Sequence, residues 1–296
     1  MASASTVSLI GLLGIALASL YATPAAAEES RTGGKLLLTG GVSSVEGAAG
    51  GGLATWAVIG GDETDAGIGA SAHATYIALP DFDLTSFGVT LGIHDRVELS
   101  YAHQAFDTRS AGAALGLGHG FTFHQHVFGA KLRLIGDAVY DQDSALPQIS
   151  IGVQYKSADR DAIIHAVGGR QSKGTDFFVS ATKLLLAQSL VLNGTVRATK
   201  ANQFGLLGFG GDRSNVYHAE VEGSAALMLS RHIAIGAEYR SKPDNLGFAR
   251  ENDAWDAFVA WAPIRHVTLT AAYVDLGDIA TFTSQRGAFL SLQTSF

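Results

Sequence analysis

Two histidines at alternate positions, His124 and His126, come nearest to a metal-site pattern in this sequence. On a strand their imidazoles share one face, but zinc takes three or four ligands and no third is marked. Asp141 and Asp143 resemble the start of a calcium loop, yet no glycine and distal glutamate follow at the EF-hand spacing. The sequence therefore predicts no metal site and no cofactor.

His218, Glu220 and Ser224 share one face of a predicted strand and could supply polar groups to a lipid-cleaving barrel enzyme. Residues two apart on a strand lie about 6–7 Å apart, so His218 and Ser224 would be separated by about 20 Å and cannot form one triad. The chain has no cysteine, which excludes a thiol nucleophile. We expect no catalytic residues and a protein that is not an enzyme.

Gly67, Gly69 and Ala72 match the spacing of a dinucleotide-binding fingerprint. That motif needs a helix after the turn, because the helix N-terminus receives the pyrophosphate. The following residues, SAHATYIAL, continue as a strand pattern instead. With 20 basic and 27 acidic residues, the chain is also a poor partner for nucleic acid.

Strands with alternating apolar and polar residues must position these side chains. In residues 232–240, Ile233, Ile235 and Tyr239 fall on one face, whereas Glu238 and Arg240 fall on the other. Similar segments recur along the chain, and no apolar run after the first 27 residues approaches the 18 or so of a membrane helix. The pattern predicts an all-β fold, a transmembrane antiparallel β-barrel of about 12 to 14 strands.

The polar face of these strands points into the barrel if the apolar face contacts lipid. Both charge signs occur on it, so ion pairs across strands are expected. The predicted lumen-lining residues are Arg96, Glu98, Lys131, Arg133, Lys156, Arg197, His218, Glu220, Glu222, Glu238, Arg240 and Asp256.

Short and long connections alternate along the predicted strands. Short turns fall at 94–95, 187–188, 230–231 and 263–265, and longer polar links fall near 107–120, 157–173, 201–215, 242–252 and 276–285. Outer-membrane barrels have short periplasmic turns, longer extracellular loops and an even number of strands. Whether residues 33–60 add two, one or no strands decides between 12 and 14.

The two ends of the chain carry export and assembly features. Residues 7–21 are an apolar run followed by Pro24 and an A-x-A site, so we expect a signal peptide over 1–27, cleaved near Ala27. Residues 28–50 are glycine-rich and could be a plug, a tail or a first strand, with the barrel over 51–296. Leu290, Leu292 and Phe296 match the C-terminal signal that the barrel-assembly machinery reads, whereas Thr294 departs from it.

Residues 33–61, GGKLLLTGGVSSVEGAAGGGLATWAVIGG, resemble an uncharacterised proteobacterial family known as domain of unknown function 3034. The resemblance extends over most of the mature chain. It implies a porin-like barrel in the bacterial outer membrane and supplies no catalytic residues.

The polar inner face is the feature that bears on function. It favours an outer-membrane channel or transporter for a small solute, in contact with membrane lipid. The alternative is a structural or interaction protein whose lumen is plugged by ion pairs and the glycine-rich segment. A lipid-modifying barrel enzyme is the third and least favoured possibility.

Overall fold

The computed structural model describes residues 35–62 and 65–296. The predicted signal peptide over residues 1–27 lies outside the described residues. Among those residues no helix is both long and apolar enough to cross a bilayer.

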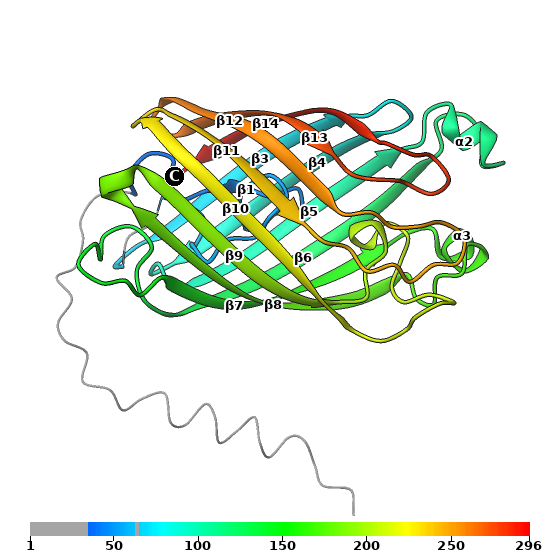
Figure 1. The fold of residues 1–296 in the computed structure, drawn as a ribbon, viewed down its shortest axis with the longest axis horizontal. Coiled ribbons are helices and arrows are strands. Elements are labelled where there is room, and N and C mark those ends of the chain that lie inside the picture. The colour runs from blue at the N-terminus through cyan, green and yellow to red at the C-terminus, as the bar shows by residue number, and fades with distance from the viewer. Residues whose placement is uncertain (1–34, 63–64) are drawn as a thin grey trace, which may run out of the picture. The chain divides into compact units, whose positions relative to one another are not determined.

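In the described residues, twelve antiparallel strands close into a barrel in which each strand pairs with its neighbour in sequence and β14 pairs with β3. This confirms the predicted barrel at the lower strand number. Figure 1 shows the strands running obliquely around it. The strands are β3 (Ile68–Ala78), β4 (Asp83–Ile93), β5 (Val97–Asp107), β6 (Thr122–Ile135), β7 (Gln148–Ala158), β8 (Lys173–Leu185), β9 (Leu190–Thr199), β10 (His218–Ser230), β11 (Ile233–Arg240), β12 (Ala254–Ile264), β13 (Val267–Asp275) and β14 (Arg286–Ser295).

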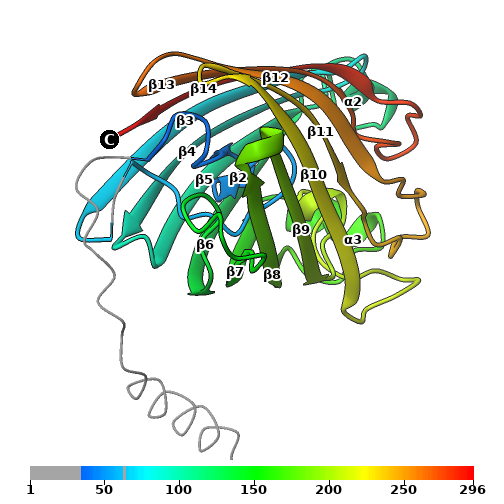
Figure 2. The same ribbon diagram turned by 60° about the vertical axis from the view of Figure 1, so that its left-hand side comes forward.

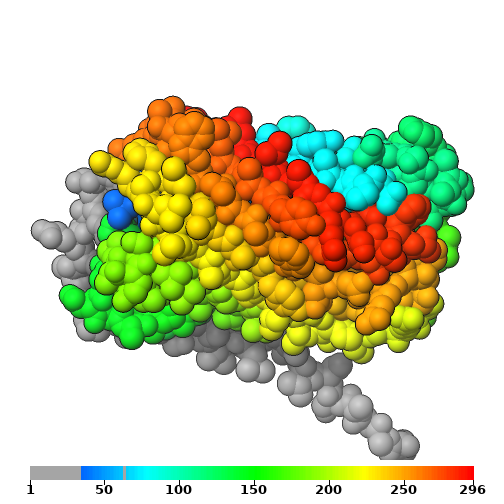
Figure 3. All heavy atoms as spheres, turned by 45° about the horizontal axis from the view of Figure 1, so that its top comes forward, coloured from blue at the N-terminus to red at the C-terminus, as the bar shows by residue number. Residues whose placement is uncertain are grey.

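The strands form because their side chains alternate between two environments. In β4, Ser86 and Thr90 are buried inside, whereas Phe87 and Val89 are exposed on the outer face. An outer face of large apolar side chains on a closed sheet satisfies the backbone internally and suits hydrocarbon contact, which makes this a transmembrane barrel. Figure 3 shows that face as a continuous surface over β10 to β14 and β3.

The connections divide the barrel into two ends. The turn end holds the links 94–96, 186–189, 231–232 and 265–266, together with the C-terminus. The loop end holds the long links 108–121, 159–172, 200–217, 241–253 and 276–285. Four short helices lie in these connections in the described residues: α2 (Ala111–Ala114), α3 (Asp161–Ala166) and η3 (Gln203–Gly205) at the loop end, and η2 (Leu186–Gln188) at the turn end. The link 136–147 is a long connection at the turn end.

Residues 43–61, called the plug below, lie inside the barrel and are buried throughout. Two short strands, β1 (Val42–Ser43) and β2 (Ala49–Gly50), pair with each other and with no wall strand, and Gly50 also bridges Thr55 of the plug. Figure 2 shows β2 within the ring of barrel strands. The first wall strand begins at Ile68 and not at the expected residue 51, because residues 51–61 hydrogen-bond to wall side chains and to other plug residues, and not to the backbone of a wall strand.

Both ends of the plug lie at the turn end. Before it, Lys35 forms an ion pair with Asp95 of the 94–96 turn at 3.3 Å. After it, Asp62 pairs with Arg265 of the 265–266 turn at 3.3 Å, and its amide donates to the carbonyl of Phe296 at 3.1 Å. The plug therefore enters and leaves the barrel through the same opening.

Candidate functional site

A cluster of buried charges joins the plug to the barrel wall. Glu46 of the plug pairs with Lys156 and, at 3.0 Å, with Arg240. Arg197 lies 4.0 Å from the same carboxylate and 2.5 Å from Glu222. We call this set the charge cluster; its members are Glu46, Lys156, Asp176, Arg197, Glu222 and Arg240. Its three cations and three carboxylates balance, which is what buried charges require.

Wall carboxylates accept hydrogen bonds from the plug backbone. Glu238 accepts from the amide of Leu53 at 2.7 Å, and Glu222 accepts from the amide of Thr55 at 2.7 Å. Glu98 accepts from the amide of Gly60 at 2.8 Å. Since these plug amides have no strand partner, the carboxylates satisfy donors that would otherwise be buried without one.

Wall donors bind the plug carbonyls in the same way. The Lys131 ammonium donates to three plug carbonyls, at 3.2, 3.0 and 2.6 Å, and pairs with Glu98 at 2.9 Å. Thr195 donates to the carbonyl of Thr55 at 2.6 Å. Ser150 donates to the carbonyl of Ala57 at 2.6 Å. The polar wall therefore replaces the hydrogen-bond ladder that an irregular segment lacks.

Glycine is needed where the plug backbone touches the wall. A Cβ on Gly51 would lie 1.6 Å from a carboxylate oxygen of Glu238. That separation is far inside van der Waals contact, so a side chain here must displace the carboxylate that binds Leu53. The glycine richness that obscures the secondary structure of this segment is thus what lets it pack so close to the wall.

Most of the predicted lumen-lining residues do face the interior. The buried ones are Glu98, Lys131, Lys156, Arg197, Glu222, Glu238, Arg240 and Asp256. His218 and Glu220 are half-buried where β10 begins at the loop end, and they contact Ser214 and Ser241.

Two predicted residues lie at the turn end and do not reach the charge cluster. Arg133 pairs with Asp95 and Asp137 at the edge of the opening. Arg96 does not line the lumen as predicted. It is exposed and lies in the turn before β5, because the strand begins one residue later at Val97. Asp176 was not among the predicted residues, although alternation in β8 places it on the inner face. Nothing in the sequence pattern marks Glu46 of the plug.

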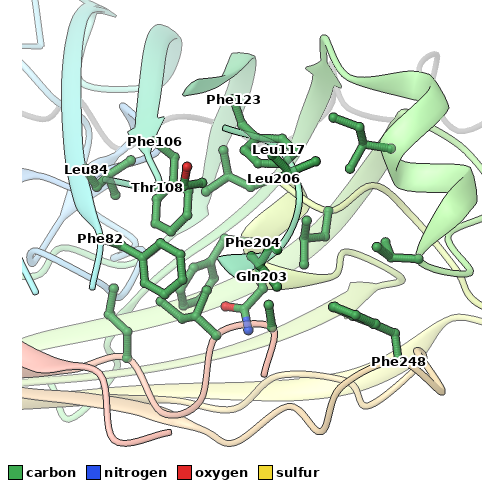
Figure 4. Close-up of a pocket in the computed structure, with 17 residues that line it drawn as sticks. Phe82, Leu84, Phe106, Thr108, Leu117, Phe123, Gln203, Phe204, Leu206 and Phe248 are labelled. Atoms are coloured by element: carbon green, nitrogen blue, oxygen red, sulfur yellow. The ribbon is translucent and has the colours of Figure 1, made fainter. Parts of the chain in front are cut away.

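A second feature is an apolar chamber inside the loop end, with a volume of about 140 Å³. Its buried walls come from the ends of β4, β5 and β6 and from the link 79–82, and the rings of Phe82 and Phe106 stack with centroids 5.0 Å apart. Figure 4 shows these rings facing Phe204 and Leu206 across the space. Further lining residues come from four other loops: Leu117, Ile163, Phe248 and Ile279.

A buried ion pair within the link 241–253 connects it with two neighbouring loops. Glu251 lies 3.3 Å from the ammonium of Lys242, and its carboxylate accepts from the amide of Gln203 at 3.1 Å. Lys242 also donates to the carbonyl of Leu276 at 2.8 Å. Burial raises the pKa of Glu251, although Lys242 opposes the shift.

The histidines and serine with metal or catalytic potential lie in separate parts of the barrel. His103 adds a third imidazole beside His124 and His126, with ring centroids 5.3 and 5.0 Å away, on the outer face. Even so, no group of three or more His, Cys, Asp or Glu within 35–62 and 65–296 has metal-site geometry. His218 and Ser224 are not brought together: His218 bonds to Ser214, whereas Ser224 bonds to Trp56 and Glu238.

The glycine pattern at 67–72 and the predicted assembly signal lie at barrel strands β3 and β14. Residues 68–78 form a single strand, so the glycine pattern at 67–72 starts no helix. Leu290 and Leu292 of the predicted assembly signal are exposed on the outer face of β14. The backbone of Phe296 pairs with Ala70, so the last residue extends the ladder with β3.

The chain is similar in structure to several solved outer-membrane proteins. It is similar to the KdgM porin at 9% identity over 76% of this chain and 99% of that one, with a TM-score of 0.48. For the NanC porin the identity is 11%, the coverage 77% and 98%, and the TM-score 0.48. For outer membrane phospholipase A from Escherichia coli the identity is 8%, the match covers 76% of this chain and 96% of that one, and the TM-score is 0.43.

Comparison by sequence identifies a family but no curated relative. No curated protein matches the chain. The model of the family "Protein of unknown function (DUF3034)" matches residues 39–293, which is most of the barrel together with the plug, and the chain therefore belongs to that family.

Proposed function

We propose that this protein is a gated outer-membrane channel for a small solute, closed in this structure by the plug. The observation that carries the proposal is that polar wall side chains bind the plug through its backbone. Each of those wall groups can be hydrated when the plug moves away, so the barrel would retain a polar lumen. A barrel of twelve strands is also wider than the eight-stranded kind that side chains alone can fill.

A permanently filled scaffold is the competing function, and the two differ in whether the plug leaves. Buried ion pairs are a costly way to fill a lumen, because apolar residues of similar volume are often as stable or more stable. The charge cluster is therefore better explained by a lumen that is sometimes wet. An enzymatic role is not part of the proposal, since His218 and Ser224 bond to different partners.

The proposal includes a location. The apolar outer face would contact membrane lipid, and the turn end would face the periplasm. Leu290, Leu292 and Phe296 would present the signal read by the barrel-assembly machinery, after export and cleavage near Ala27. Fractionation with the outer membrane and a mature N-terminus near Glu28 are the expected results; an intact residue 1–27 segment on inner-membrane protein would contradict this part.

A disulfide between plug and wall tests gating directly, because the chain has no cysteine of its own. A Cβ on Gly47 of the plug would lie 3.1 Å from the Cβ of Ala102 in β5, a few tenths of an ångström inside the disulfide range of about 3.5–4.5 Å. The positive φ of Gly47 means that its backbone must shift slightly to accept the cysteine. We expect the Gly47→Cys/Ala102→Cys protein to conduct in planar bilayers when reduced and to be silent when oxidised. The two single variants are matched controls that should ignore the oxidant.

Two outcomes would contradict gating. Conductance that persists in the fully oxidised double variant would show that solute passes beside a fixed plug. Silence of the unmodified and reduced proteins under all voltages, together with no solute uptake into vesicles, would favour the structural alternative.

A further inference from the structure

The chamber at the loop end has the size and lining of a binding site for a small apolar molecule. Its volume of about 140 Å³ would be an unusual void in a well-packed protein. Apolar cavities of about 150 Å³ lined by Leu, Ile and Phe stay dry and accept a molecule the size of benzene. The chamber is lined by side chains of that kind, from Phe82 and Phe106 to Leu206 and Ile279.

The polar side chains of the chamber are already satisfied. Its lining includes two, Thr108 and Gln203. The hydroxyl of Thr108 donates to the carbonyl of Phe121 at 2.7 Å. The amide of Gln203 donates to the carbonyl of Asp278 at 2.8 Å and accepts from Lys242 at 3.4 Å. A polar or charged ligand would lose its hydration here without gaining a partner, so the chamber selects against one.

One residue connects the chamber to the charge cluster. The ring of Phe204 lines the chamber, and the guanidinium of Arg240 lies 4.5 Å from its centroid. The carbonyl of Phe204 accepts from Lys156 at 3.2 Å. Arg240 and Lys156 are the two cations closest to Glu46 of the plug. A ligand that moves Phe204 therefore moves a group shared with the residues that hold the plug.

The backbone at this point is strained. Gln203 and Phe204, within η3 (Gln203–Gly205), both have positive φ angles, of 46° and 58°. Non-glycine residues adopt this conformation at a cost and keep it where the surroundings impose it, commonly at ligand sites. The plug residues Val45 and Leu53 also pack into the same apolar cluster as the chamber walls. The chamber and plug thus share an apolar contact as well as Phe204.

We propose that the chamber binds one uncharged, apolar molecule about the size of a single aromatic ring, and that Phe204 transmits its binding to the plug. The transmission step rests on the proposed function, because it requires a plug that moves. The binding step does not depend on it, because the chamber is present with the plug in place.

Fluorobenzene is a suitable probe, followed by fluorine NMR on the refolded full-length mature protein in phospholipid nanodiscs. We expect saturable binding at one site per barrel. Leu117→Trp, on an exposed loop, and Leu206→Trp, on the buried wall, each fill the chamber and should weaken binding at least tenfold. Leu227→Trp, on the lipid-facing side of β10, is the matched control and should bind normally.

The charge of the probe provides the second comparison. The carboxylate 4-fluorobenzoate should bind more than a hundredfold more weakly than fluorobenzene. Equal fluorobenzene signals in the original protein and both filled variants would show partition into lipid alone and overturn the site. Comparable binding of 4-fluorobenzoate would overturn the apolar class of the ligand.

Transmission to the plug needs a separate measurement. A single Gly47→Cys variant places a buried thiol in the plug, and a water-soluble maleimide should label it faster when fluorobenzene saturates the chamber. Phe204→Leu should keep the binding and lose the acceleration. An unchanged labelling rate with the chamber occupied would overturn the role of Phe204. If the oxidised disulfide protein still conducts while fluorobenzene binds as expected, the gated channel fails and the binding site stands.

Discussion

The plug region and the loop-end chamber occupy the same barrel interior but are built in opposite ways. Around the plug, charged and polar side chains bind the backbone so closely that Gly51 has no room for a methyl group. At the loop end, aromatic and aliphatic side chains from several loops surround an unfilled space. The contrast separates two kinds of interior: a polar wall holds the plug by specific bonds, whereas the apolar chamber is left unfilled.

Removing one charge from the plug should produce the largest effect. Glu46→Gln leaves Lys156, Arg197 and Arg240 with one carboxylate too few, and breaking a buried pair costs about 3–5 kcal/mol. We expect the plug to detach and the open fraction in bilayer recordings to rise more than a hundredfold.

Glu220→Gln is the matched control for that change, because Glu220 is half-buried at the loop end and bonds to Ser241. Its conductance should stay close to that of the original protein. Equal opening in both variants would show that general loss of negative charge, and not release of the plug, opens the barrel.

A truncation in the chamber wall should cost less stability than a comparable change in a filled core. Leu206→Ala removes a buried side chain that already borders empty space, so we expect about 2 kcal/mol, the lower end of the usual range for such truncations. Unfolding from lipid vesicles measures it. A loss near 5 kcal/mol would mean that the loop end is packed as tightly as the plug.

Adding a single methyl group tests the close packing of the plug. Gly51→Ala forces the carboxylate of Glu238 aside and should destabilise the closed state by about 1–3 kcal/mol, as overpacking does. Gly194→Ala, in β9, is its control, because a Cβ there meets nothing within 4 Å. Similar unfolding midpoints for the two variants would contradict the tight contact between plug and wall.

The smallest expected effect is a pH dependence confined to the loop end. Because burial raises the pKa of Glu251, the folded protein holds this proton more tightly than the unfolded chain does. Stability of the loop end should therefore fall as pH rises from the ordinary glutamate pKa of 4.5 through the raised pKa of the folded protein. Hydrogen exchange around Gln203 measures it, and Glu251→Gln should remove the dependence; a rise in protection with pH would reverse the assignment.

Much of the wall could be predicted from the sequence because alternation is a local signal. It placed Glu222, Glu238 and Arg240 inside, and the structure buries all three. The same rule failed at Arg96, where the strand had not yet begun. Periodicity identifies a face only within the strand, and it does not fix where the strand starts.

The plug and the chamber could not be predicted in this way. Residues 43–61 have no repeating pattern, since their backbone is held by side chains that lie up to 250 positions away, as with Ser43 and Gln293. The chamber gathers Phe82, Phe204 and Phe248 from connections that have no common motif. Their proximity follows from the closure of the barrel, which brings loops distant in sequence to one end.

The shared opening through which the plug enters and leaves has a consequence for topology. Because the segments on either side of it are both anchored at the turn end, the plug is a loop and not a thread. It can be withdrawn or inserted without passing a chain terminus through the ring of strands. A closed barrel can therefore receive the plug by insertion of this loop, without threading it through the ring of strands.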